Sequence, residues 1–117
     1  MAFVDLFMAP VPVGNRDAYL SHSTVAAGVF KEHGAISVTE CWGVDIPPGQ
    51  MTSMPMAVKL EDGETVVTGW VLWPTKEARD AGMAKVMGDP RMQPDENPMP
   101  LDGERMIFGG FEVMLQA

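Results

Sequence analysis

The sequence predicts an α+β domain of the ferredoxin-like type, in which an antiparallel sheet carries two helices on one face and has one added strand. The first observation is the order of segments along the chain, strand, helix, strands, helix and strand, which is the βαββαβ order of that fold. The second is the length, because 117 residues fit one domain, residues 1–117. The third is that several strand segments are apolar on both faces, although two helices cover only one. A second copy of the chain is therefore expected to cover the other face.

The first predicted strand covers residues 2–11 and closes at Pro10 and Pro12. Side chains of a strand alternate between the two faces of its sheet, and a sheet with one face in water is apolar on the other face only. Here both sets are apolar, with Val4, Leu6 and Met8 on one face and Phe3 and Phe7 on the other.

The first predicted helix runs from Asn15, as its N-cap, to about Glu32, and Gly34 stops it. At 3.6 residues per turn, one set of its side chains falls within an arc of about 100° and forms the stripe that faces the sheet. This set is Tyr19, His22, Ala26, Val29, Phe30 and His33.

The middle of the chain is predicted to add a second strand and a hairpin. Residues 35–44 form the strand, and residues 46–50 form a loop that contains two prolines and a glycine. Residues 54–60 and 65–73 form the hairpin, with Asp62 and Gly63 as its turn.

A second helix and a last strand complete the predicted fold. Thr75 is the N-cap of this helix and Gly88 marks its end, with Met83, Val86 and Met87 on the buried stripe. The last strand covers residues 105–116 and is again apolar on both faces. Between these elements, residues 88–104 contain four prolines and read as a long loop, for which a lid or interface arm, an ordered connector and a disordered segment are the alternatives.

The composition excludes several classes of partner. Sixteen acidic and eight basic residues give a formal charge of −8, so we expect no nucleic acid and no anionic membrane as partner. No apolar run approaches the roughly 20 residues of a membrane span. Cys41 is the single cysteine, and Met1 to Met8 lack the features of a signal peptide, so a reducing cytoplasm is the expected location. Eleven methionines indicate an adaptable core and interface, or else a ligand surface.

Several stretches spread over nearly the whole chain carry a resemblance to a known family. They are Phe3, Val4 and Asp5; Lys31 to Ala35; Glu40 and Cys41; Lys85, Val86, Met87, Asp89, Pro90 and Arg91; and Met99, Pro100, Asp102, Gly103, Arg105, Met106, Ile107, Gly109, Gly110, Phe111 and Glu112. These stretches resemble the YbaA-like family of uncharacterised bacterial proteins, domain-of-unknown-function family 1428. The resemblance implies a dimeric α/β barrel, in which two ferredoxin-like sheets pack face to face, and implies no particular chemistry.

His22 is the best single candidate for a general base, because the reference pKa of histidine suits proton transfer near neutral pH. For both His22 and His33, however, the favoured interpretation is a hydrogen-bonded histidine with a structural role. The two residues are about 16 Å apart along a helix, so they cannot share one metal ion, and no metal site is expected.

Asp5 and Glu112 interrupt apolar faces of the first and last strands, which are neighbours in this topology. A buried carboxylate is costly without a partner. Each is therefore expected to meet a cation, in its own chain or across the dimer, and a structural ion pair is favoured over paired acid and base catalysis. The candidate cations are Arg105, Arg16 and Lys59.

The leading functional hypothesis is a small apolar or aromatic molecule held between helices and sheet, lined by Tyr19, Phe30, Trp42 and Trp70, with His22 beside them. One alternative is a non-enzymatic module for dimerisation or protein binding. Another, by analogy of fold, is an oxygenase that needs no cofactor, and no cofactor is expected because phosphate-binding glycine motifs are absent. A cavity above about 300 Å³ with His22 at its wall favours the first hypothesis over a non-enzymatic module.

Overall fold

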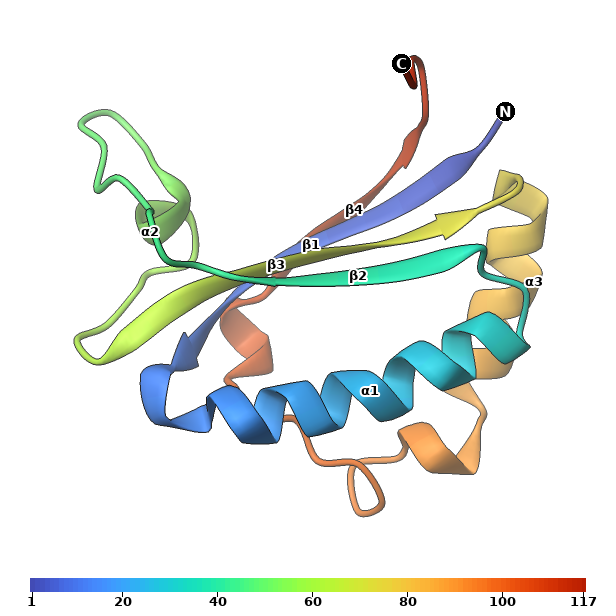
Figure 1. Cartoon of the computed structure of the whole chain (residues 1–117), viewed down its shortest axis with the longest axis horizontal. Helices are drawn as coiled ribbons and strands as arrows, with labels where there is room; N and C mark the ends of the chain where they lie inside the picture. Colours follow the sequence, from blue (N-terminus) through green and yellow to red (C-terminus); the bar gives the residue numbers. More distant parts are fainter.

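The computed structural model describes all 117 residues as one layer of sheet with its main helices on one side (Figure 1). The main elements are β1 (Phe3–Pro12), α1 (Arg16–Glu32), β2 (Ser37–Trp42), α2 (Met54–Ala57), β3 (Glu64–Trp73), α3 (Lys76–Met87) and β4 (Ile107–Glu112). Three short 3-10 turns join them, η1 (Val13–Asn15), η2 (Pro90–Met92) and η3 (Gly103–Arg105).

The sheet has the order β2-β3-β1-β4, and every neighbouring pair of strands is antiparallel. The two central strands pair over their full lengths, from Phe3 opposite Trp73 to Pro12 opposite Glu64. Both long helices, α1 and α3, lie on the same face of this sheet (Figure 1). This arrangement confirms the predicted α+β, ferredoxin-like fold.

The predicted added strand is wrong, because residues 54–60 form no hairpin with β3. The short helix α2 stands there instead, and the Ser53 hydroxyl caps it by accepting a hydrogen bond from the Met56 amide at 3.1 Å. Pro55 suits the first turn of a helix and has no amide proton to give to a sheet. The segment contacts β3, and Val58 and Val66 are both almost fully buried.

The ends of the long helices follow the sequence signals with one exception, and one residue of the predicted buried stripe is exposed. Thr75 caps α3 by accepting from the Ala78 amide at 3.0 Å, and Gly34 follows α1 with a positive φ of 109°. Asn15 stands at the N-cap of α1, but its amide donates to the Pro100 carbonyl at 3.0 Å instead of capping the helix. Met87 is 64% exposed, so its predicted place on the buried stripe of α3 is wrong.

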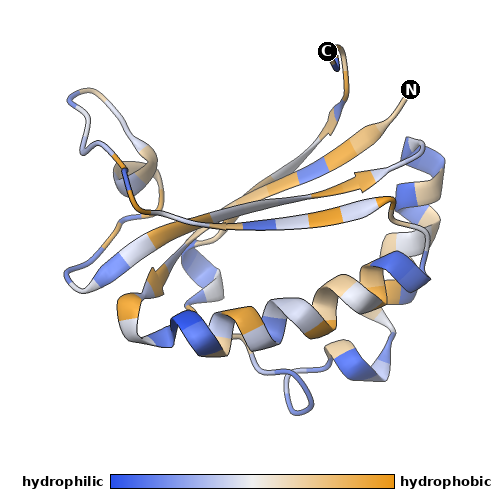
Figure 2. Cartoon of the chain, in the orientation of Figure 1, coloured by the Kyte–Doolittle hydropathy of each residue, from blue (hydrophilic) through white to orange (hydrophobic).

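The two faces of the sheet differ in their cover. Against the helices lie two buried clusters, the first of Phe3, Ala35, Val71 and Trp73 and the second of Ala9, Val11, Tyr19 and Val67. The pairing register places another apolar set on the opposite face, which we call the bare sheet face: Val4, Leu6, Met8, Trp70, Leu72, Ile107 and Phe111. Phe111 is 53% exposed and Ile107 43% exposed. Figure 2 shows hydrophobic bands along the strands, and the pairing register assigns these residues to both faces.

None of the helices combines the length and the apolar character that crossing a membrane requires.

Candidate active site or ligand cavity

A cavity of about 420 Å³ lies between α1, α3 and the helix-covered face of the sheet. Fourteen of its twenty lining residues are hydrophobic, so an apolar molecule would fit its walls. Sheet, helices and the segment after α3 all contribute to this lining. Its volume is above the 300 Å³ set as the condition for the ligand hypothesis, and His22 is part of its wall.

Methionines form a large part of one side of the cavity. Met83 and Met87 come from α3, and Met92, Met99 and Met106 come from the segment between α3 and β4. Methionine is unbranched and polarizable, so it adapts to the shape of a neighbour. Five of the eleven methionines are thus explained by one cavity.

Tyr19 of α1 and Glu40 of β2 form a hydrogen-bonded pair at the cavity wall, with the Tyr19 hydroxyl 2.5 Å from Glu40 Oε2. Burial raises the pKa of Tyr19 far above its ordinary value, and the hydrogen bond to Glu40 raises it further. Burial also raises the pKa of the Glu40 carboxyl, and the hydrogen bond from Tyr19 opposes that rise. The sequence analysis missed Glu40 as a site residue, although it alternates with Val38 and Trp42 on the face toward the helices.

Asp5 and Arg79 make a second polar group in the same wall. Asp5 Oδ2 accepts a hydrogen bond from Trp73 Nε1 at 3.0 Å, and Arg79 Nε lies 3.8 Å from Asp5 Oδ1. The Arg79 guanidinium also lies over the Phe3 ring, 4.6 Å from its centroid. Gly110 is next to this group, and a side chain there would meet both the Phe3 ring and Arg79 Nη2.

The expected cations therefore do not pair with Asp5. Arg105 binds Glu64 with two hydrogen bonds of 2.8 Å and Asp102 with one of 3.0 Å, because it stands on η3 beside the start of β3. Arg16 lies over the Trp42 ring, 5.4 Å from its centroid. Glu112 is exposed on β4 and has no ion pair, so the prediction that it is paired is wrong within this chain.

His22 contributes one ring nitrogen at most to the cavity. Its Nδ1 atom is enclosed by protein and has no hydrogen-bond partner. The backbone carbonyl of His22 accepts a hydrogen bond from the Asn97 amide at 3.2 Å.

Of the four aromatic residues expected to line the site, the structure places Tyr19 and Phe30 at the cavity and the two tryptophans elsewhere. Trp42 faces the helices but packs against Tyr19, with ring centroids 6.3 Å apart, and does not line the cavity. Trp70 pairs with Leu6 and belongs to the bare sheet face. The prediction that Trp70 lines this site is wrong, because a strand presents neighbouring residues to opposite faces.

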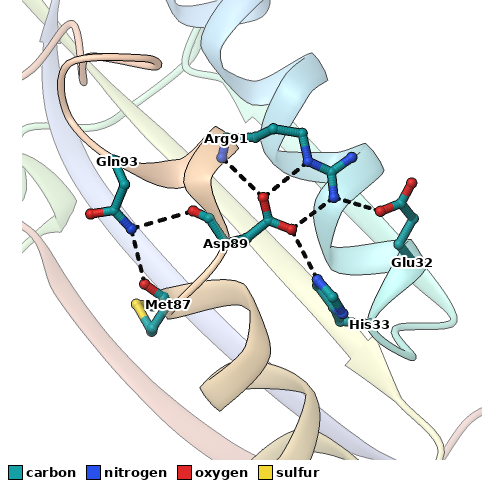
Figure 3. A network of polar contacts seen from close by, with 6 residues as sticks. All are labelled: Glu32, His33, Met87, Asp89, Arg91 and Gln93. Atoms are coloured by element: carbon teal, nitrogen blue, oxygen red, sulfur yellow. Dashed lines mark hydrogen bonds and ion pairs between the residues drawn. The ribbon is translucent and has the colours of Figure 1, made fainter.

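His33 takes part in a separate polar network at the end of α1 (Figure 3). Asp89 Oδ2 lies 3.0 Å from His33 Nε2 and 2.7 Å from Arg91 Nη2, and Arg91 also binds Glu32. Glu32, His33 and Asp89 offer ligand atoms within 4.8 Å of one another, a grouping that could hold a metal ion. The guanidinium of Arg91 already occupies the carboxylates, so a metal ion would have to displace it. The network ties η2 to the end of α1.

Comparison with known proteins gives a consistent picture of family and fold. A family model described as "Protein of unknown function (DUF1428)" matches residues 2–103. The chain is 48% identical over 115 residues to the uncharacterized protein YbaA of Escherichia coli K12 and of Shigella flexneri, covering 98% of each chain. Among solved structures it is similar to SnoaB, a cofactor-independent oxygenase from Streptomyces nogalater, with a TM-score of 0.59, 14% identity, and coverage of 98% of this chain and 95% of that one. The likeness to SnoaB is one of fold.

Proposed function

This chain belongs to the DUF1428 family of bacterial proteins of unknown function, and we propose that it binds a small, mainly apolar or aromatic molecule in the cavity between α1 and the sheet. The single observation that carries the proposal is the cavity itself, about 420 Å³ of space with mostly hydrophobic walls. A concave site of this size, with mainly apolar walls and a few polar groups, is the usual form of a small-molecule site.

The polar groups of the wall indicate a specific ligand and not non-specific binding of any apolar molecule. Tyr19 with Glu40, Asp5 with Arg79, and His22 each place polar atoms in an otherwise apolar lining. A few placed polar groups within an apolar cavity are what ligand sites use to orient a molecule.

The test uses the uncharged fluorescent probe N-phenyl-1-naphthylamine, whose emission rises in apolar surroundings. Ala26 lines the cavity, and Ala26→Phe is expected to weaken probe binding by about tenfold or more because the new ring takes up the space. Ala84→Phe on the exposed side of α3 is the matched control and should bind as the parent does. Unchanged binding to Ala26→Phe would show that the probe sits elsewhere and that the proposal is wrong.

His22 gives a second candidate function, turnover of the bound molecule without a cofactor. SnoaB, whose fold is similar, is named a cofactor-independent oxygenase. The residue of this chain suited to move a proton in the cavity is His22. The fold alone does not supply that chemistry.

A homodimer is the proposed assembly, in which two bare sheet faces pack together. The exposed Leu6, Trp70, Ile107 and Phe111 support it, since water-exposed apolar surface of this extent is costly. Native mass spectrometry at micromolar concentration is expected to give the mass of two chains, and a persistent monomer would contradict it. A cytoplasmic location is also proposed, supported by Cys41, which has no second cysteine to pair with.

A further inference from the structure

Glu40 differs from the other charged groups of the cavity wall because no cation balances it. Asp5 meets both Trp73 and Arg79. Glu40 takes one hydrogen bond, from Tyr19 to Oε2, and its other carboxylate oxygen, Oε1, has no hydrogen bond. The ion pairs of the chain likewise leave Glu40 out.

The sheet leaves room for this carboxylate above its central strand. Glu40 is opposite Gly69 in the β2–β3 pairing, and Gly69 is opposite Phe7 in the β1–β3 pairing. A Cβ atom at Gly69 would lie 3.1 Å from Glu40 Oε2 and 2.7 Å from the Phe7 ring. The absence of a side chain at Gly69 therefore lets the carboxylate and the apolar ring meet at the cavity floor.

Glu40 is partly open to solvent, so water can solvate its free oxygen before a ligand enters the cavity. A ligand that fills the cavity displaces this water, and a donor on the ligand would restore the lost hydrogen bond. The donor can be neutral or cationic. An ammonium group would have to give up its own water in a cavity that already contains the Arg79 guanidinium. The free-energy cost of desolvation is much smaller for a neutral hydroxyl group than for an ammonium group. Its hydrogen bond to a charged acceptor is also stronger than one to a neutral acceptor.

We propose that Glu40 is the polar anchor of the cavity and that the ligand is an apolar or aromatic molecule with a hydroxyl group, which donates to Glu40 Oε1. This inference rests on the proposed function, since it names the class of molecule that the cavity takes. Tyr19 is the positioning residue, because its hydroxyl holds Oε2 and so fixes the orientation of the carboxylate.

The test compares four naphthalenes that differ in one substituent, by displacement of N-phenyl-1-naphthylamine at pH 7. They are 2-naphthol, 2-methoxynaphthalene, 2-naphthoate and 2-naphthylmethylammonium. The parent protein is expected to bind 2-naphthol about tenfold or more tightly than 2-methoxynaphthalene, which has no proton to donate. Glu40→Leu should abolish this preference and Glu40→Gln should reduce it, because the glutamine amide oxygen is a neutral acceptor. Glu77→Leu, an exposed glutamate of α3, is the control that should keep the preference.

A second measurement keeps the inference testable if the Glu40 variants fold poorly. In the parent protein, the carboxyl carbon resonance of Glu40 is expected to shift when 2-naphthol is added and to stay in place with 2-methoxynaphthalene. Equal affinity for these two compounds, an unmoved resonance, or tighter binding of the ammonium or the carboxylate would each overturn the inference. If Ala26→Phe weakens probe binding while the hydroxyl preference is missing, this inference fails and the proposed function stands. If Ala26→Phe has no effect, the proposed function itself fails.

Discussion

Asp89 is a buried polar residue whose hydrogen-bond partners compensate the cost of its burial. It is 9% exposed, and its two oxygens accept from the Arg91 amide, the Arg91 guanidinium and the His33 ring. The hydrogen bonds from Arg91, and then the one from His33, hold the pKa of Asp89 well below its ordinary value. Because the folded-state pKa lies below the unfolded one, this residue stabilises the fold above about pH 4, the unfolded value. The stabilisation is lost as the pH falls through the folded-state pKa.

Asp89→Asn is therefore expected to lower the melting temperature at pH 7 and to flatten its fall between about pH 4 and pH 2. Thermal unfolding followed by circular dichroism across this pH range measures both effects. Asp95→Asn, an exposed aspartate of the same segment, is the matched control and should behave as the parent does. Equal melting temperatures of the two variants at pH 7 would contradict a stabilising role for the network.

At the scale of elements, the segment between α3 and β4 acts as one wall of the cavity. It contributes Met92, Met99 and Leu101 to the lining. Two side-chain amides tie it to the helix region, from Asn97 to the His22 carbonyl and from Asn15 to the Pro100 carbonyl. Asp89, Arg91 and Arg105 fix the two ends of the segment, whereas these two amide bonds hold its middle, residues 94–101. The middle is therefore the part of the wall that can open at the lowest cost.

Removing one of these ties is expected to speed the passage of ligand. Asn97→Ala loses a hydrogen bond that contributes on the order of 1 kcal/mol. The rates of association and dissociation of N-phenyl-1-naphthylamine should both rise several-fold, with a smaller change in affinity, as stopped-flow fluorescence would show. Asp95→Ala changes the same segment without removing a hydrogen bond and should leave both rates unaltered. Equal rates in the parent and in Asn97→Ala would mean that ligand enters elsewhere.

Local sequence signals, such as helix caps, predicted most helices and strands. The errors concern a short helix and a pair of residues that are distant in sequence. Thr75 and Gly34 mark helix ends through bonds and angles of a few neighbouring residues, so the sequence suffices to place them. Ser53 and Pro55 are helix-start signals of the same kind for α2. The alternation of apolar residues in this segment led instead to the prediction of a strand. Arg79 as the partner of Asp5 could not be predicted, because it depends on where α3 crosses the sheet.

The sequence predicted the face of the sheet on which the site lies better than it predicted which residues line the site. The 3.6-residue period of the first helix assigned Tyr19, His22 and Phe30 to the side that faces the sheet, and all three reach the cavity. Strand alternation, applied to β3, would have excluded Trp70, which pairs with Leu6 on the other face. Glu40 went unnoticed because its significance comes from the empty space over Gly69, a residue far away in sequence.

At the scale of the whole molecule, one face of the sheet lacks the helical cover that the other face has. Two helices cover one face of the sheet, and the bare sheet face exposes apolar side chains such as Trp70, Ile107 and Phe111. Figure 1 shows no helix against most of that face. A second copy is the proposed cover.

A charge on the bare sheet face is expected to separate the proposed dimer. Ile107→Asp places an unpaired carboxylate where the two sheets would meet, which should weaken association by about 100-fold or more. Leu20→Asp is the matched control, since Leu20 is 65% exposed on α1. Light scattering after size-exclusion chromatography should give one chain for the first variant and two for the second. A dimer that survives Ile107→Asp would place the interface elsewhere.

The methionine side of the cavity makes the molecule chemically sensitive to oxidants. Addition of one oxygen atom turns a thioether into a polar sulfoxide. Met87 and Met99 are the members most open to a peroxide, at 64% and 50% exposure. Oxidation of these two sulfurs would make part of the apolar cavity wall hydrophilic. Exposure of the protein to oxidants would therefore change which ligands the cavity binds.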